Sequence, residues 1–421
     1  MIVQRTETHI IKESNPIYGW ILEECSRSRN LYNKTLFIYR QAFTGNHDKI
    51  KDFKSIIRHD KFISSFELVK QMAKLKDVDY YSMTKKNSGT QVVCQVDKTM
   101  KSWFASLKAY KKDPSKFRGR PRIPSYKKKD ELNCLTYTYV DAKLQKDGTI
   151  NISKTIKLPI HTNLKSFQQI RLVPKTGYVQ VEIIYNKEIS DLKLDQTRAI
   201  GIDLGLNNLM AITSNIGNIS NLVNGRPLKS MNQYYNKKKA YFMSLLEKGG
   251  LKSSKRLRRL EMKRMMKIKD YLHKTSRRVV ELMERNNIGT CFIGHNDGWK
   301  NEANMGKKNN QNFVSIPYSL LINMLRYKIE EKGGVLIELN ESYTSKCSFL
   351  DNEEIRKHES YKGKRVKRGL FLSGEGKALN ADINGSLNIL KRGMKFSFDF
   401  KESFFRPTKI DIQKKLLNPL G

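Results

Sequence analysis

The sequence contains few cysteines and no long apolar run, and each absence excludes a class of protein. Its five cysteines form no Cys-x-x-Cys pair and lie far apart, at Cys25, Cys94, Cys134, Cys291 and Cys347. Their odd number and scatter exclude a disulfide framework and favour a reducing cytosol. No apolar stretch approaches the roughly 18 residues of a transmembrane helix, and the charged start MIVQRTETHIIKES is unlike a signal peptide. We therefore expect a soluble cytoplasmic protein.

Acidic residues are scarce relative to basic ones. The chain of 421 residues has 80 Lys and Arg against 41 Asp and Glu, a formal net charge of +39. With 38% hydrophobic residues it can still bury a core, and its length suggests two or three domains. Self-repulsion at this charge favours a polyanionic partner, with nucleic acid the first candidate and an anionic membrane the second.

The hydrophobic pattern of the first half predicts helices and then a small sheet. After an opening strand, helical periodicity covers about 16–45, 53–76 and 89–111. The β-rich, turn-punctuated segments that follow predict an antiparallel barrel or sheet closed by the opening strand. These segments are 133–140, 149–159, 168–174 and 178–186.

The second half follows a polar linker at 187–197 and reads β-β-…-α-β-α-β-α, so the fold class is multidomain α+β. A long basic helical region at about 226–287 is broken at Gly249–Gly250, which predicts an antiparallel helical hairpin. Asn380 is expected to cap the last helix.

Three carboxylates in this half each have an ordinary explanation when taken singly. Asp203, in GIDLG, could cap a turn; Asp382, in NADINGSLNIL, could interact with a helix dipole. Glu341 could be an exposed strand-end carboxylate. Together, however, carboxylates from two strands and a helix form the set that two-metal phosphodiester hydrolysis needs, with Mg²⁺ preferring such oxygen ligands.

The segments GIDLGLNNLMAIT, SYTSKCSFLD and NADINGSLNIL resemble, in order and spacing, the three blocks of the RuvC-type nuclease domain of TnpB proteins. TnpB proteins are transposon-associated, OrfB-type, RNA-guided endonucleases related to small type V CRISPR effectors. The likeness extends to NLYNKTLFIYRQ, to SWFASLKAYKKDPSKFRGRPRIPSYK and to the segments HNDGWKNEANMGKKNNQNFVSIPY and HESYKGKRVKRGLF. It covers most of residues 1–392.

The resemblance implies an oligonucleotide-wedge β-barrel with an inserted helical recognition lobe, followed by an RNase H-like (RuvC) nuclease domain. The corresponding ranges are 1–15 with 131–190, 16–130 and 196–392, and 393–421 form a tail. It implies a monomer that binds a guide RNA from the transposon end and recognises a short motif beside a double-stranded DNA target. Cleavage would depend on Mg²⁺, with Mn²⁺ as a substitute, in a prokaryotic cytosol near the nucleoid.

The sequence departs from the family at the second catalytic acid. Most relatives have a Glu at the end of the strand before a basic loop, but CFIGHND places Gly294 there. Either the nuclease is inactive or another carboxylate replaces the Glu. Glu341 closes the next strand, which is a neighbour in an RNase H-like sheet, so Asp203, Glu341 and Asp382 are the expected catalytic and metal-binding residues. Glu338, Asp297 and Glu302 are the alternatives.

A second departure concerns zinc. Many relatives carry a four-Cys zinc ribbon, whereas residues 347–379 contain only Cys347 and His358. Tetrahedral zinc needs four ligands, so no structural zinc is expected. Cys347 is then most simply a small buried residue.

Basic clusters at 101–129 and 252–278 are candidate phosphate contacts, and the second has twelve Lys and Arg against two acidic residues. A solvated charged face is the ordinary alternative. In the first cluster, aromatic residues interleave with Lys116, Arg118, Arg120 and Arg122, and Tyr126 is placed to stack on a base.

Gln91 and Gln95 lie one helical turn apart where the family reads its target-adjacent motif, and Gln can pair with an adenine edge. Residues 362–369, KGKRVKRG, are expected to flank the nuclease cleft.

The favoured function is an active RNA-guided DNA endonuclease. A nuclease-inactive, RNA-guided DNA-binding repressor is the first alternative, because Gly294 replaces the acid. A DNA-only transposase is the second, since RNase H-like folds also support integrases.

Overall fold

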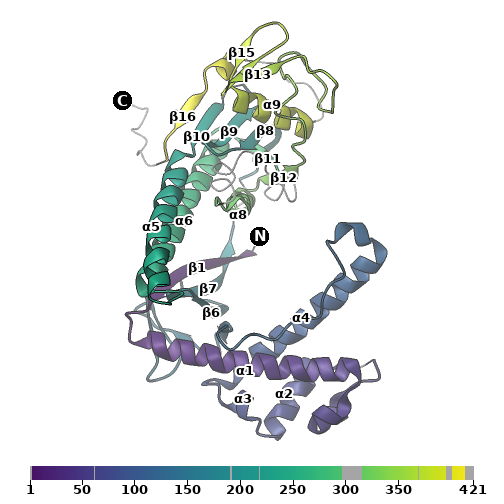
Figure 1. Ribbon diagram of the computed structural model, residues 1–421, viewed down its shortest axis with the longest axis vertical. Coiled ribbons are helices and arrows are strands. Elements are labelled where there is room, and N and C mark those ends of the chain that lie inside the picture. Colours follow the sequence, from purple (N-terminus) through teal and green to yellow (C-terminus); the bar gives the residue numbers. More distant parts are fainter. Residues whose placement is uncertain are drawn as a thin grey trace. The chain divides into compact units, whose positions relative to one another are not determined.

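The structure is a computed structural model, and it describes residues 2–60, 62–189, 192–217, 219–295, 315–367, 369–394 and 401–412. The chain forms two compact units, Ile2–Glu188 and Ile189–Gly421 (Figure 1). The division falls within the polar segment that the sequence predicts as a linker. Among the described residues, no helix combines the length and apolar character needed to cross a membrane.

The first unit contains a long helical part. Its α-helices are α1 (Ile17–Thr44), α2 (Ser65–Lys74), α3 (Val78–Tyr81) and α4 (Lys86–Lys112), with 3₁₀ helices η1 (His47–Ile56) and η2 (Pro114–Lys116). The prediction of one helix over 53–76 is wrong. Ile57 and Ser64 are extended, with ψ of 123° and 133°, so the chain leaves the helical conformation between η1 and α2.

The strands of the first unit form two antiparallel sheets. One has the order β1-β7-β6-β2, from β1 (Ile2–Lys12), β2 (Leu135–Thr138), β6 (Gln169–Lys175) and β7 (Tyr178–Glu188). The other joins β3 (Lys143–Leu144), β4 (Thr149–Asn151) and β5 (Lys157–His161). The opening strand does join the first sheet, by pairing with β7 along its whole length. Closure of these strands into a barrel stays a prediction.

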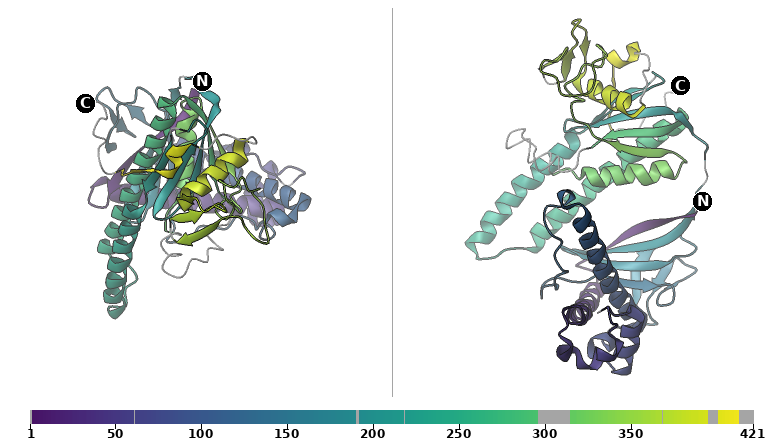
Figure 2. Two further views of the ribbon diagram at one scale, coloured as in Figure 1. Left: turned by 90° about the horizontal axis from the view of Figure 1, so that it is seen from above. Right: turned by 90° about the vertical axis from the view of Figure 1, so that its right-hand side faces the viewer.

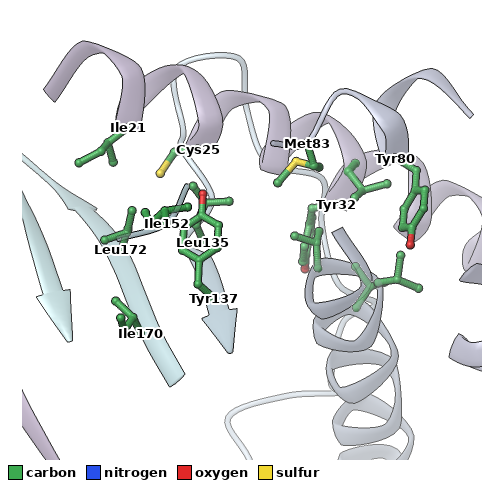
Figure 3. Packing of buried hydrophobic residues seen from close by; sticks show 14 of the residues in the cluster. Ile21, Cys25, Tyr32, Tyr80, Met83, Leu135, Tyr137, Ile152, Ile170 and Leu172 are labelled. Atoms are coloured by element: carbon green, nitrogen blue, oxygen red, sulfur yellow. The ribbon is translucent and has the colours of Figure 1, made fainter. Parts of the chain in front are cut away.

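Helix α1 covers the first sheet with apolar side chains. Figure 3 shows Ile21 and Cys25 of α1 directed at Leu135, Tyr137 and neighbouring strand residues, all of them buried. Burial raises the pKa of the Cys25 thiol well above its ordinary value. Cys25 is therefore a small core residue rather than a nucleophile.

The second unit is built on a six-stranded mixed sheet with the order β12-β11-β8-β9-β10-β16. The strands are β8 (Asp195–Leu204), β9 (Asn208–Ser214), β10 (Ser220–Asn224), β11 (Ile288–Gly294), β12 (Val335–Leu339) and β16 (Thr408–Ile410). Strands β8, β11 and β12 are mutually parallel, so their carboxyl ends lie together at one edge of the sheet, the carboxyl edge.

Helices cover both faces of this sheet (Figure 2). Side chains alternate along β8: Ile200 and Ile202 share a core with α6 (Lys255–Arg285) and α8 (Tyr318–Glu330), whereas Ala199 packs with α9 (Ala381–Met394). Gly201 permits the close approach of α9, because a Cβ there would lie 2.5 Å from the Ser386 carbonyl oxygen. Asp203 therefore belongs to the face that α9 covers.

The remaining elements complete the second unit. They are α5 (Arg226–Lys248), β13 (Lys364–Lys367), β14 (Leu370–Leu372), β15 (Ala378–Leu379) and η3 (Glu402–Phe405). The predicted hairpin break is confirmed: α5 ends before Gly249, and Gly250 has a φ of +66°, which glycine adopts without strain. The predicted cap is also confirmed, since Oδ1 of Asn380 accepts the backbone N–H of Asp382 at 3.0 Å.

Candidate functional site

Asp203 lies near the end of the central strand β8 and is held against α9. A Cβ at Gly385 of α9 would lie 2.5 Å from its Oδ2, so only glycine leaves room for this carboxylate. No described residue donates a hydrogen bond to the Asp203 side chain. A half-buried carboxylate that packs on a helix without a donor has its oxygens available for a cation.

Asp382 occupies the first turn of α9, where the helix dipole favours a negative charge. Its two oxygens have different partners: Nδ2 of Asn208 donates to Oδ2 at 2.7 Å, and the Arg365 guanidinium lies 3.4 Å from Oδ1. Asn208 starts β9, directly after the loop that follows Asp203. The Asn208 hydrogen bond therefore fixes the Asp382 carboxylate beside that loop.

Glu341 lies two residues beyond β12, and its side chain lies beside Gly294. Gly294 ends β11, between β8 and β12, with Ile293 opposite Ile202 and Gly294 opposite Leu339. A Cβ on Gly294 would lie 3.0 Å from Oε2 of Glu341 and 3.1 Å from its Cβ. Cδ1 of Ile389 would lie closer still, at 2.6 Å, so the Ile389 and Glu341 side chains together occupy the space that a side chain at 294 would enter.

The pKa values of Asp203 and Glu341 reflect their burial first and the neighbouring charges second. The pKa of Asp203 is raised well above its ordinary value, first by burial and then by repulsion from Asp382 and Glu341. Burial also raises the pKa of Glu341, and His295 opposes that rise. Burial without a paired cation disfavours the charged form, so a bound cation would restore it.

This donor set suits a hard divalent ion. Asp203, Glu341 and Asp382 all offer carboxylate oxygens, which Mg²⁺ prefers. Within the described ranges, no group of three or more His, Cys, Asp or Glu side chains is placed to hold a metal ion, and this includes the set Asp203, Glu341 and Asp382. Mg²⁺ is usually held by one or two carboxylates together with water and substrate phosphates, so a complete protein cage is not needed.

The alternatives to Glu341 differ in their surroundings. Glu338 lies 2.9 Å from Nδ1 of His295 and forms an ion pair with Arg326. The negative charge of Glu338 is therefore already compensated by a cation other than a metal bound at Asp203. Asp297 and Glu302 lie outside the described residues. Of the candidates that the structure describes, Glu341 is the one that repels Asp203.

Cys347 and His358 lie in the segment before α9 that the sequence analysis examined for zinc ligands. Cys347 is buried, and its backbone oxygen accepts Nδ2 of Asn384 at 2.9 Å and Nδ2 of Asn388 at 2.8 Å. The His358 ring is within hydrogen-bond distance of the Glu354 carbonyl, at 2.7 Å. The expectation of no structural zinc stays a prediction.

Gln91 and Gln95 both line a groove of about 300 Å³ formed by α4, β2 and β6. The two differ in their partners. Gln95 accepts a hydrogen bond from Nδ2 of Asn133 at 3.0 Å, and its own Nε2 lies 3.9 Å from the Cys134 sulfur. Gln91 forms no side-chain hydrogen bond to a described residue. Gln91 is thus the more available of the two.

The predicted basic loop follows α4, and the side chains of Lys116, Arg118, Arg120 and Arg122 are exposed to solvent. Lys116 pairs with Asp113 at 3.3 Å, whereas Arg118, Arg120 and Arg122 have no ion pair with any described residue. Tyr126 is 40% exposed, and the Arg40 guanidinium lies 4.8 Å from the centre of its ring. The three arginines are available to phosphates.

Sequence reasoning missed the residues that support the carboxylates. Asn208 and Gly385 sit within the motifs that contain Asp203 and Asp382, but the motifs alone do not show which side chains touch. Arg365 falls in the segment 362–369 that was expected to flank the cleft, and it contacts Asp382. The aromatic residues that line a groove between α5 and α6 were also missed.

Two family models match separate parts of the chain. Residues 182–300 match the family model of the OrfB_IS605 probable transposase, and 318–389 match that of the Cas12f1-like TNB domain. The TnpB-like protein ORF457 of Acidianus two-tailed virus is 26% identical over 235 residues. That alignment covers 53% of this chain and 48% of the viral protein, so the chain matches about half the length of this relative.

Two solved structures also align with the chain. One, of a Cas12f1–sgRNA–target DNA complex, is 17% identical with a TM-score of 0.37 and covers 92% of this chain and 100% of that one. The other, of a CRISPR–Cas12f ternary complex, is 13% identical with a TM-score of 0.38 and covers 90% and 82%.

Proposed function

Since this chain belongs to the TnpB family, we propose that it is an RNA-guided DNA endonuclease with a RuvC-like catalytic domain. In this proposal the unit Ile189–Gly421 cleaves DNA, while Ile2–Glu188 comprises the wedge barrel and the recognition lobe. The partners are a guide RNA and a double-stranded DNA target. The net charge of +39 supports polyanionic partners.

The observation that carries the proposal is the set of acids at the carboxyl edge. Asp203 and Glu341 lie at the ends of parallel strands, Asp382 opens α9, and Asp382 and Glu341 both repel Asp203. Keeping acidic groups together in a packed site destabilises the fold unless a cation compensates them. The arrangement is therefore better explained by function than by stability.

Each residue has a distinct role in this proposal. Asp203, on the central strand, and Asp382 and Glu341 would together hold two Mg²⁺ ions. Bound Mg²⁺ supplies an activated water and stabilises the leaving oxygen of the phosphodiester. Asn208 orients the Asp382 carboxylate through its 2.7 Å hydrogen bond. Two divalent ions with two Asp and one phosphate would remain undercompensated, which is why Glu341 is needed.

The test begins with the nucleic acid that co-purifies with the expressed full-length chain. Sequencing should identify an RNA with a constant scaffold and a variable guide end. A plasmid library carrying the guide-matched target beside randomised positions is then incubated with the complex and Mg²⁺. We expect cleavage by the wild type and none by Asp203→Ala, with DNA binding unchanged.

The first alternative is an RNA-guided repressor that does not cleave, and the observation that favours it is Gly294 at the position of the family acid. Binding of the target without cutting in Mg²⁺ or Mn²⁺ would establish it. Absence of co-purifying RNA together with DNA strand transfer would instead support a DNA-only transposase.

A further inference from the structure

A large groove of the second unit lies on the basic hairpin, away from the carboxylates. It has a volume of about 870 Å³ and is formed by residues 230–242 of α5 and 256–267 of α6. Its lining includes six Lys or Arg and four aromatic residues, and it contains no carboxylate among the lining side chains. A surface of this composition is suited to a polyanion that also offers flat rings.

The aromatic residues of the groove have different environments. Tyr234 and Tyr241 are 60% and 56% exposed. Tyr235 is buried instead: its hydroxyl donates to Oε1 of Glu261 at 3.0 Å, and the Arg264 guanidinium lies 4.8 Å from the centre of its ring. Tyr235 therefore forms part of the buried base of the groove, whereas the rings of Tyr234 and Tyr241 are accessible to a ligand.

The groove has exposed cations on both of its helices. Lys238, Arg259, Lys263 and Lys267 form no ion pair with any residue in the described part of the chain. Glu261, which lies in the same stretch of α6, already accepts from Tyr235. An external anion would therefore relieve the repulsion among these cations.

The hairpin starts at the same edge of the sheet as the candidate active site. Strand β9 is antiparallel to both β8 and β10, so β10 ends at the carboxyl edge, and α5 begins two residues later. The Gly225 N–H donates to the carbonyl of Asn207, in the loop that follows Asp203, at 2.7 Å. The buried residues of α6 that join the sheet core begin at Ile268, so the groove-forming part lies beyond the sheet (Figure 1).

We propose that this groove binds the single-stranded DNA that enters or leaves the nuclease site, a proposal that rests on the proposed endonuclease function. Exposed tyrosines between cations stack on unpaired bases while the cations contact phosphates. A duplex hides its base faces, so the rings would not contribute to binding it. A strand at the carboxyl edge needs a path away from the acids, and the hairpin provides a positively charged one.

The experiment measures binding of a fluorescent oligo(dT) of about a dozen nucleotides, within the usual site size of such grooves. The full-length chain is used with its co-purified RNA, at elevated salt to weaken contacts made by phosphates alone. Tyr241→Ala and Tyr234→Ala should each weaken binding by about tenfold, the typical loss for one stacked base. Both side chains are exposed, so folding should be unaffected.

Two control variants make the result specific. Tyr241→Phe should retain oligo(dT) affinity, because it keeps the ring. Tyr139→Ala removes an equally exposed tyrosine, 66% exposed, from the first unit and should have no effect. Oligo(dT) containing 5-iodouracil should cross-link to the groove tyrosines upon irradiation.

Wild-type oligo(dT) binding by the Tyr234→Ala, Tyr241→Ala double variant would overturn the proposal. So would a loss confined to oligo(U) or to duplex DNA, because it would assign the groove to another nucleic acid. If the wild type binds through these tyrosines but never cleaves, the endonuclease function fails while the binding of single-stranded DNA by the groove stands.

Discussion

Replacing Gly385 by alanine tests whether the contact between α9 and Asp203 positions the active site. The new Cβ would lie 2.5 Å from Oδ2 of Asp203, whereas ordinary van der Waals contact begins at 3.4 Å. Relief of the overlap needs a displacement of about 0.9 Å, the difference of these two values. A shift of about 1 Å in a catalytic group can lower the rate by about 100-fold.

The stability of Gly385→Ala should change less than its activity. Overpacking costs about 1–3 kcal/mol, while alanine in place of glycine inside a helix recovers about 0.8–1 kcal/mol. The net loss in the free energy of unfolding should therefore be about 0–2 kcal/mol. The assay is the initial rate of target-plasmid cleavage, together with a thermal melt that confirms folding.

Gly19→Ala is the matched control. Gly19 lies in α1, and a Cβ added there would have no other atom within 4 Å, so alanine should maintain the cleavage rate and slightly raise stability. If Gly385→Ala folds and cuts at the wild-type rate, the packing of α9 on Asp203 does not position the catalytic carboxylate, and the reasoning is refuted.

Three further predictions concern pH, metal affinity and DNA recognition. A raised carboxyl pKa means that the stability present at acidic pH is lost as pH rises towards it, so metal-free Asp203→Asn should melt above the wild type at neutral pH. That difference should shrink below about pH 3, where carboxyl groups are largely protonated in both states; a constant difference would refute it. Asn208→Ala removes the donor to Asp382 and should raise the Mg²⁺ concentration for half-maximal cleavage by about 10–100-fold, measured by metal titration. Gln91→Ala should relax the motif preference by roughly 1–3 kcal/mol in the library assay, whereas Arg120→Ala should weaken binding uniformly; an unchanged preference would remove Gln91 from the readout.

The sequence predicts the arrangement of the second unit better than the details of its site. The rule that parallel strands end at one edge brings Asp203 and Glu341 together, and a helix-capping pattern places Asp382 at the start of α9. These are local or topological regularities that a motif records directly. The catalytic roles of the three residues stay predictions.

Other features depend on contacts between distant segments and could not be predicted. The hydrogen bond from Asn133 to Gln95 joins residues far apart in sequence, and it distinguishes two glutamines that look equivalent. The space that Gly385 leaves for Asp203 needs both elements in place. The helical expectation over 53–76 failed because apolar periodicity continues across a segment whose backbone is extended at Ile57 and Ser64.

Glu341 is proposed to replace the acid missing at Gly294, and the substitution Glu341→Gln removes the charge on which that role depends. The substitution keeps the shape of the side chain and removes its charge. Glu338→Gln is the matched control. Glu338 lies in β12, the strand that precedes Glu341, and its carboxylate contacts His295 and Arg326 instead. The measurement is the rate of guide-directed plasmid cleavage in Mg²⁺ at equal target occupancy. We predict a loss of at least about 100-fold for Glu341→Gln, with target binding unchanged and Glu338→Gln near the wild type. Cleavage by Glu341→Gln at the wild-type rate would contradict the account.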